Sequence, residues 1–211
     1  MKKVLIFLLI CFGNAWIWKI FEKNFLLGVL CIVASLSLFS LLISNKPRKN
    51  LLIISSLSLV VIASFQIKWF DPNSFVDTTP LEKDLMEKRM RLYPNPRIAH
   101  WLEQRQELIA FYRFRNNLGE ALDFNYYFFA NHPRERVGVT EHEKFSPVLF
   151  PLLLVGLYLS IKTGKHLGFY LLFIFILFTS AATYTNEPVG FALVFPFIVS
   201  LSILALNKYV K

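Results

Sequence analysis

The chain has 211 residues, 55% of them hydrophobic and 22 of them Phe, which excludes an ordinary soluble globular domain. Its formal net charge of +9 would suit nucleic-acid binding, but the positions of the charges exclude that class. Segment 68–144 holds 12 Lys or Arg and 12 Asp or Glu, and the other 11 basic residues all border apolar runs. This distribution is typical of a membrane protein, and no nucleic-acid partner is expected.

Six apolar runs, almost free of charge, follow one another along the chain. Each holds roughly 15 to 20 residues, close to the ~20 that cross a hydrocarbon core of ~30 Å. We therefore predict an all-α integral membrane protein with six transmembrane helices in a 3+3 arrangement, and a small helical extracytoplasmic domain between the third and fourth. The predicted domains are 1–66, 67–146 and 147–211. The runs are 4–20, 25–44, 51–67, 147–161, 167–183 and 189–206.

The basic residues beside the apolar runs predict the orientation. Nine of these 11 fall on one side of the membrane if six helices cross it, and the positive-inside rule makes that side cytoplasmic. We expect a multi-pass protein of the plasma (inner) membrane, with both termini cytoplasmic and residues 67–146 extracytoplasmic. The nine residues are Lys2, Lys3, Lys46, Arg48, Lys49, Lys162, Lys165, Lys208 and Lys211.

The first apolar run has two interpretations. "MKK", "VLIFLLICF" and "GNA" give it the basic start, short apolar core and small-residue end of a cleavable signal peptide. A membrane helix is favoured, because apolar residues continue through 16–20. Cys11 and Cys31 both lie inside apolar runs, so the external segment has no disulfide or zinc framework.

The external segment carries start and stop signals of helices. In "TTPLEKDLMEKRMRLYP", Thr79 is a predicted N-cap with Glu82 three residues later, a capping box, and Pro94 ends the helix. A second helix is predicted to start at Asn95 and stop at Gly119. Its apolar stripe is Ile98, Trp101, Leu102, Ile109 and Tyr112. Its opposite face, expected to be solvated rather than functional, carries Arg97, Glu103, Gln104, Glu107 and Arg113.

The aromatic stretch "FNYYFF" lies shortly before the fourth apolar run. Aromatic rings with polar tips favour the head-group zone of a bilayer. We expect this stretch to lie on the bilayer surface or against the helix bundle.

The next loop, "NHPRERVGVTEHEKFSP", is dense in His, Arg and Glu. Arg134 and Arg136, with His132, are candidates for binding a lipid phosphate, since guanidinium groups pair with phosphate oxygens. The competing interpretation is that both arginines pair with acids of their own loop. The spacing of His and Glu does not match a metal site, so no metal and no cofactor are expected.

Three acids are candidates for acid–base catalysis, namely Glu22, Glu135 and Glu187, although none lies in a recognisable motif. Glu187, in "TYTNEPVGF", also suits a structural role as a carboxylate in the first turn of the helix that Pro188 starts. A catalytic role would require Glu187 to meet the loop of Arg134 and Arg136 on the external face.

Two stretches, "YYFFANHPRERVGVTEHEKFSPVLFPLLLVGLYLSI" and "FYLLFIFILFTSAATYTNEPVGFALVFPFIVSLSIL", make residues 123–206 resemble the later half of membrane glycosyltransferases of the protein-mannosyltransferase type. The resemblance implies a polyprenyl-phosphate-linked sugar as substrate. That family carries its catalytic acid, usually within an acidic pair, in the first external loop of a longer chain. The corresponding loop here, "WKIFEKNF", holds Glu22 alone, so no catalytic residue is carried over.

We therefore expect a non-catalytic binding or accessory component at the external membrane surface, with membrane lipid or other membrane proteins as partners. The alternative is a glycosyltransferase-like enzyme or subunit that acts on polyprenyl-phosphate-linked sugars. A small-solute transporter is less favoured, because the apolar runs carry almost no ionisable residues and no inverted repeat is visible.

Overall fold

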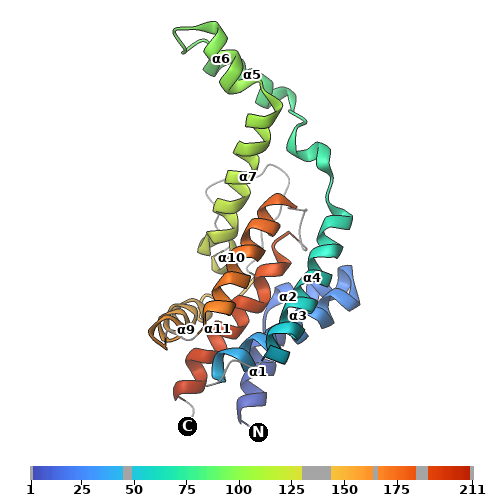
Figure 1. Ribbon diagram of the computed structural model, residues 1–211, viewed down its shortest axis with the longest axis vertical. Helices are drawn as coiled ribbons and strands as arrows, with labels where there is room; N and C mark the ends of the chain where they lie inside the picture. The colour runs from blue at the N-terminus through green and yellow to red at the C-terminus, as the bar shows by residue number, and fades with distance from the viewer. Residues whose placement is uncertain (1, 45–48, 130–143, 164–165, 184–189, 210–211) are drawn as a thin grey trace.

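The computed structural model describes residues 2–44, 49–129, 144–163, 166–183 and 190–209, and these form helices and turns without any strand (Figure 1). The predicted all-α class is confirmed for this part of the chain. The α-helices are α1 (Lys2–Phe12), α2 (Ala15–Lys23), α3 (Phe25–Ile43), α4 (Lys49–Trp69), α5 (Pro80–Met90), α6 (Pro96–Glu103), α7 (Gln106–Leu122), α8 (Phe124–Phe128), α9 (Leu149–Thr163), α10 (Leu167–Ala182) and α11 (Phe195–Tyr209). Two short 3₁₀ helices, η1 (Pro72–Phe75) and η2 (Ala192–Val194), complete the list.

The apolar helices pack into one bundle. Helix α3 lies against α4 and α11, α11 lies against α9, and α10 lies against α4 and α7. Buried serines help to join them, since Ser200 Oγ of α11 donates to the backbone oxygen of Ser35 in α3 at 3.2 Å. Helices α4 and α10 run in the same direction, because Leu52 is beside Gly168 at one end and Gln66 bonds to Thr183 O at the other.

Helix length limits how many elements cross a membrane. Helices α3 and α4, with 19 and 21 residues, are long and apolar enough to span one. Helices α9, α10 and α11 have 15, 16 and 15 residues, so each is roughly 22–24 Å long against a hydrocarbon core of ~30 Å. The described residues therefore contain two candidate spans, or three if α1 and α2 form one, which is compatible with a membrane location. Six spans stay a prediction.

The first apolar run is not a straight helix, because α1 and α2 meet at an angle of 68°. Asn14, which is buried, accounts for the break. Its Nδ2 donates to Ile10 O and Cys11 O at the end of α1, both at 2.8 Å, and its Oδ1 accepts from Ile17 N at the start of α2 at 2.9 Å. One side chain thus satisfies backbone groups that both helix ends leave without intrahelical partners.

An arm of α5, α6 and the first half of α7 extends from the bundle (Figure 1). The predicted capping box of α5 is confirmed: Glu82 N donates to Thr79 Oγ1 at 3.2 Å, and Thr79 N donates to Glu82 Oε2 at 2.7 Å. Helix α7 then returns beside α10, where Asn117 Nδ2 donates to Ala181 O at 3.1 Å.

The predicted helix from Asn95 to Gly119 is wrong at two places. The chain breaks at 104–105 into α6 and α7, and α7 continues past Gly119 to Leu122. Gly119 does not stop the helix, because the tertiary contacts made by the buried Asn117 and Ala121 extend the last turn along the bundle.

Gly156 sets how closely α9 approaches α11. A Cβ atom built at Gly156 would lie 1.9 Å from the backbone oxygen of Leu201, whereas one built at Gly119 would meet nothing within 4 Å. We predict that Gly156→Ala destabilises the protein by about 1–3 kcal/mol, the usual effect of overpacking.

The matched control is Gly119→Ala, which we expect to stabilise α7 by about 0.5–1 kcal/mol because alanine is a better helix former. Thermal unfolding of both variants in the same detergent measures the difference. Equal stability of the two variants would contradict the close crossing of α9 and α11.

Candidate functional site

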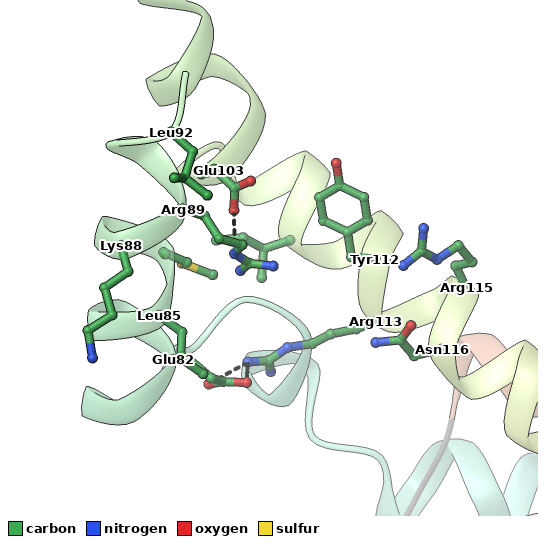
Figure 2. A pocket seen from close by; sticks show the side chains of 12 residues that line it. Glu82, Leu85, Lys88, Arg89, Leu92, Glu103, Tyr112, Arg113, Arg115 and Asn116 are labelled. Carbon is green, nitrogen blue, oxygen red and sulfur yellow. Dashed lines mark hydrogen bonds and ion pairs between the residues drawn. The ribbon is translucent and has the colours of Figure 1, made fainter. Parts of the chain in front are cut away.

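The arm holds an open cleft of about 730 Å³ between α5 and α7, with Glu103 of α6 at one end (Figure 2). Its lining combines apolar and charged side chains. The lining residues are Glu82, Leu85, Met86, Lys88, Arg89, Leu92, Glu103, Ile109, Tyr112, Arg113, Arg115 and Asn116.

Arg113 links the two helices on one side of the cleft. In Figure 2 its side chain reaches from α7 towards α5, where Nη2 lies 3.3 Å from both carboxylate oxygens of Glu82. The same guanidinium donates to the backbone oxygens of Ser74 and Asp77. Arg113 therefore joins α7 to the start of α5 and to the turn that precedes it, because the guanidinium presents several donors in one fixed fork.

Glu103 links α6 to α5 and to Tyr93 on the other side of the cleft. Its Oε2 lies 3.2 Å from Arg89 Nε, and its Oε1 accepts a hydrogen bond from the hydroxyl of Tyr93 at 2.9 Å. Only 8% of the Glu103 side chain is exposed, whereas 58% of Arg89 is. The hydrogen bond to Glu103 raises the pKa of Tyr93. The prediction that Glu103 lies on a solvated face was wrong, because the break before α7 turns this side chain into the cleft.

The remaining lining groups are apolar, aromatic and basic. Leu85 and Leu92 are exposed, Leu92 to 83%, while Ile109, which also lines the cleft, is buried. Arg115 lies over the ring of Tyr112, with 5.2 Å from its guanidinium carbon to the ring centroid.

The lining carries four basic side chains against two acidic ones. Both acids pair with an arginine, and Lys88 pairs with Asp84, next to the lining, at 2.7 Å. The surface is thus apolar, and its positive excess rests on Arg115.

The two acids of the cleft are engaged in ion pairs. Glu82 and Glu103 each hold an arginine in place, so neither is set against a second acid or a nucleophile. Among the described residues, no group of three or more His, Cys, Asp or Glu is placed to hold a metal ion. An exposed apolar surface with surrounding cations is typical of an interaction site.

The residues proposed from the sequence lie elsewhere. Glu22 is exposed on α2, near its C-terminal end. The lipid-phosphate candidates His132, Arg134 and Arg136, and the candidate acids Glu135 and Glu187, lie outside the described residues. Their roles stay predictions.

The described residues that flank segments 130–143 and 184–189 meet in one aromatic cluster. Phe145 N donates to Tyr127 O at 2.9 Å, and Lys144 Nζ donates to Tyr126 O at 3.2 Å. The rings of Tyr126 and Phe191 are 5.1 Å apart. Since Tyr126, Tyr127 and Phe128 are buried, the expectation that "FNYYFF" packs against the bundle is confirmed.

A buried amide side chain binds both residues that flank segment 184–189. Gln66 Nε2 of α4 donates to Thr183 O at 3.1 Å and to Gly190 O at 2.9 Å. No sequence pattern predicts this contact, because a single Gln near the end of an apolar run is also common where a helix reaches the membrane surface.

No protein-family model, curated protein or solved structure matches the chain. The arm and its cleft therefore supply the main argument about function.

The ion pair of Arg89 and Glu103 should hold α6 against α5 within the arm. We predict that Glu103→Gln weakens the contact of α6 with α5 by about 1–3 kcal/mol, the usual effect of losing a hydrogen bond to a buried charged group. Hydrogen exchange of the α5 and α6 amides should become faster in this variant.

Glu107→Gln is the matched control, since Glu107 is exposed in the first turn of α7. We expect its exchange rates to equal those of the unmodified protein. Equal rates in both variants would show that the Glu103 ion pair does not hold the arm.

Proposed function

We propose that this chain is a multi-pass membrane protein of the cell envelope that acts as a non-catalytic binding component, with the arm as its contact surface. The observation that carries the proposal is the cleft between α5 and α7, which combines exposed leucines with a positive excess on an arm that extends from an apolar bundle. The partner that fits is an acidic, amphipathic segment of another envelope protein.

A membrane environment is supported by the outward faces of the bundle. Ile53 and Leu57 of α4, and Leu171 and Phe175 of α10, are all more than half exposed. Such a belt of large apolar side chains is unfavourable in water and matches lipid acyl chains.

The proposed orientation places the arm outside the cell. Lys49 begins α4, at the end of the bundle opposite the arm, and Lys162 lines a cavity there with Leu42 near the end of α3 and Asn207 near the end of α11. The positive-inside rule favours a cytoplasmic location for that end. The arm then faces the extracytoplasmic side, where other envelope proteins are available.

A protein partner fits the arm better than a lipid of the same membrane. Exposed apolar side chains continue from the cleft to the tip of the arm, which lies farthest from both termini in Figure 1. A bilayer around α3 and α4 does not reach this tip, whereas a second protein does. These side chains are Leu81, Leu85, Leu92, Ile98 and Trp101.

A defined probe tests the ligand class. We predict that a fluorescent peptide of alternating Glu and Leu binds the purified protein, that a Lys and Leu peptide of equal length does not, and that binding weakens with salt. Arg115→Glu should weaken binding of the acidic peptide about tenfold or more, a loss of ~1.4 kcal/mol or more. Fluorescence anisotropy measures this affinity.

The matched control is Arg97→Glu, which makes the same charge reversal on α6 outside the cleft lining. We expect at most a small loss of affinity from this variant. Equal weakening by both reversals, or equal binding of the two peptides, would contradict the cleft as the contact site.

The second candidate is a glycosyltransferase-like enzyme or subunit that acts on polyprenyl-phosphate-linked sugars. One observation favours it: the flanks of segments 130–143 and 184–189 meet where the ring of Tyr126 contacts that of Phe191. Under this candidate, Arg134 and Arg136 bind the lipid phosphate and Glu187 supplies an acid or base.

Under this second candidate, replacing both Arg134 and Arg136 with Ala should abolish binding of polyprenyl phosphate, because the two guanidinium groups would supply the charge that holds it. The control removes two other cations, Lys19 and Lys23 of α2, from the same expected side of the membrane. Binding of radiolabelled polyprenyl phosphate to protein in detergent is the measurement. Undiminished binding by the arginine double variant would exclude this candidate and leave the arm proposal untouched.

A further inference from the structure

Helix α2 lies at the start of the candidate span α3. Asn24 caps both helices: its backbone N–H donates to Ile20 O of α2 at 2.8 Å, and its Oδ1 accepts from Leu27 N of α3 at 3.0 Å. The backbone of Asn24 is extended, so α2 and α3 meet at a turn of one residue and not as one straight helix. If α3 crosses the membrane, this turn holds α2 at the level where α3 enters it.

The end of α4, the other candidate span, lies near the same level. Gln66 of α4 donates to Gly190 O at 2.9 Å, and Cys31 Sγ, from the second turn of α3, lies 4.0 Å from Ala192 O. The end of α4 and the first turns of α3 thus adjoin the same short segment. The last two residues of α4 are a lysine and a tryptophan, a combination typical of the head-group level of a bilayer.

The side chains of α2 divide into three faces, because successive residues of a helix turn by about 100° around its axis. One face is buried in the bundle, the next is aromatic and at least partly exposed, and the third is charged and at least partly exposed. The buried face is Trp16, Ile17 and Ile20, the aromatic face is Trp18 and Phe21, and the charged face is Lys19, Glu22 and Lys23. A helix with an apolar side beside a charged side is typical of the membrane surface.

The aromatic face of α2 continues onto the helices before and after it. The ring of Trp18 lies 5.8 Å from that of Phe12 in α1, and the ring of Phe21 lies 5.5 Å from that of Phe25 in α3. Trp18 Nε1 donates to Phe12 O at 2.8 Å. The indole N–H therefore has its acceptor within the protein, and the ring can enter an apolar environment without leaving a donor unpaired.

The aromatic face also continues into the outward side of α3. Leu26, Val33 and Leu36 are exposed there, on the same side of the helix as Phe25. Acyl chains that surround α3 would cover these residues and the aromatic face of α2 together. A bilayer therefore fits this surface better than a second protein, because its head-group region also accommodates the adjacent charged face.

We propose that α2 is an interfacial helix that lies along the extracytoplasmic boundary of the bilayer. Trp18 and Phe25 contact the first acyl carbons of the outer leaflet, and the charged face is turned towards head groups and water. The first apolar run then ends along the membrane surface and does not cross the bilayer as one straight helix. The proposal rests on the membrane location and orientation proposed above and is independent of what the arm binds.

Nitroxide labels on single introduced cysteines test the depth of α2, with the full chain in phosphatidylcholine and phosphatidylglycerol vesicles. Cys11 and Cys31 are fully buried, so each label reports its own site. Electron paramagnetic resonance compares collisions with oxygen, which concentrates in the membrane, and with a water-soluble nickel complex. The labelled variants are Trp18→Cys, Lys23→Cys and Leu57→Cys, the last at an exposed position near the middle of α4.

We expect the label at Leu57→Cys to be the deepest, the label at Trp18→Cys to be shallower but still within the bilayer, and the label at Lys23→Cys to collide mainly with the nickel complex. Trp101→Cys is the matched control, because Trp101 has a similar exposure (50% against 53% for Trp18) but lies on the arm. Its label should collide with the nickel complex alone.

Two results would overturn the interfacial position of α2. One is a Trp18→Cys label as deep as that at Leu57→Cys, and the other is a Trp18→Cys label as accessible to nickel as that at Trp101→Cys. Access of nickel to the Leu57→Cys label would instead contradict the membrane location itself, so the two failures are distinguishable.

Discussion

The packing of the described helices depends on a buried aromatic contact around Trp16. Its ring lies within 6 Å of three others, those of Tyr127, Phe145 and Phe195, with centroid distances of 5.8, 5.7 and 5.7 Å. These residues belong to α2, to α8, to the segment before α9 and to α11. Aromatic pairs of this kind add attraction beyond the area that they bury, so one cluster joins elements that are distant along the sequence.

Because this cluster fixes α8, it also fixes where the arm returns to the bundle. Helix α7 leads directly into α8 and lies beside α10, where Phe114 stacks on Phe178 with ring centroids 5.9 Å apart. The arm is thus held at its base by packing and within itself by the Arg113 and Glu103 ion pairs. A rigid support of this kind lowers the conformational entropy lost on binding, which favours its use as a contact surface.

The sequence predicts local features of this fold well and tertiary features poorly. The capping box of Thr79 and Glu82 was predictable, because both partners lie within one helical turn. The break at Asn14 and the burial of Glu103 were not, because each depends on where another helix lies. Apolar content also does not locate helix ends: Ala192–Val194 of the last run form the 3₁₀ helix η2, so α11 begins only at Phe195. Segments 130–143 and 184–189, which hold most of the candidate site residues, lie outside the described residues.

We propose that a membrane bundle presents the arm outside the cell, and single introduced cysteines test this orientation directly. Cys11 and Cys31 are fully buried, so a single introduced cysteine reports its own position. We expect a membrane-impermeant maleimide to label Leu92→Cys in intact cells and to label Lys49→Cys only after the membrane is permeabilised. Labelling of Lys49→Cys, but not of Leu92→Cys, in intact cells would contradict this orientation and the proposed contact with an envelope partner.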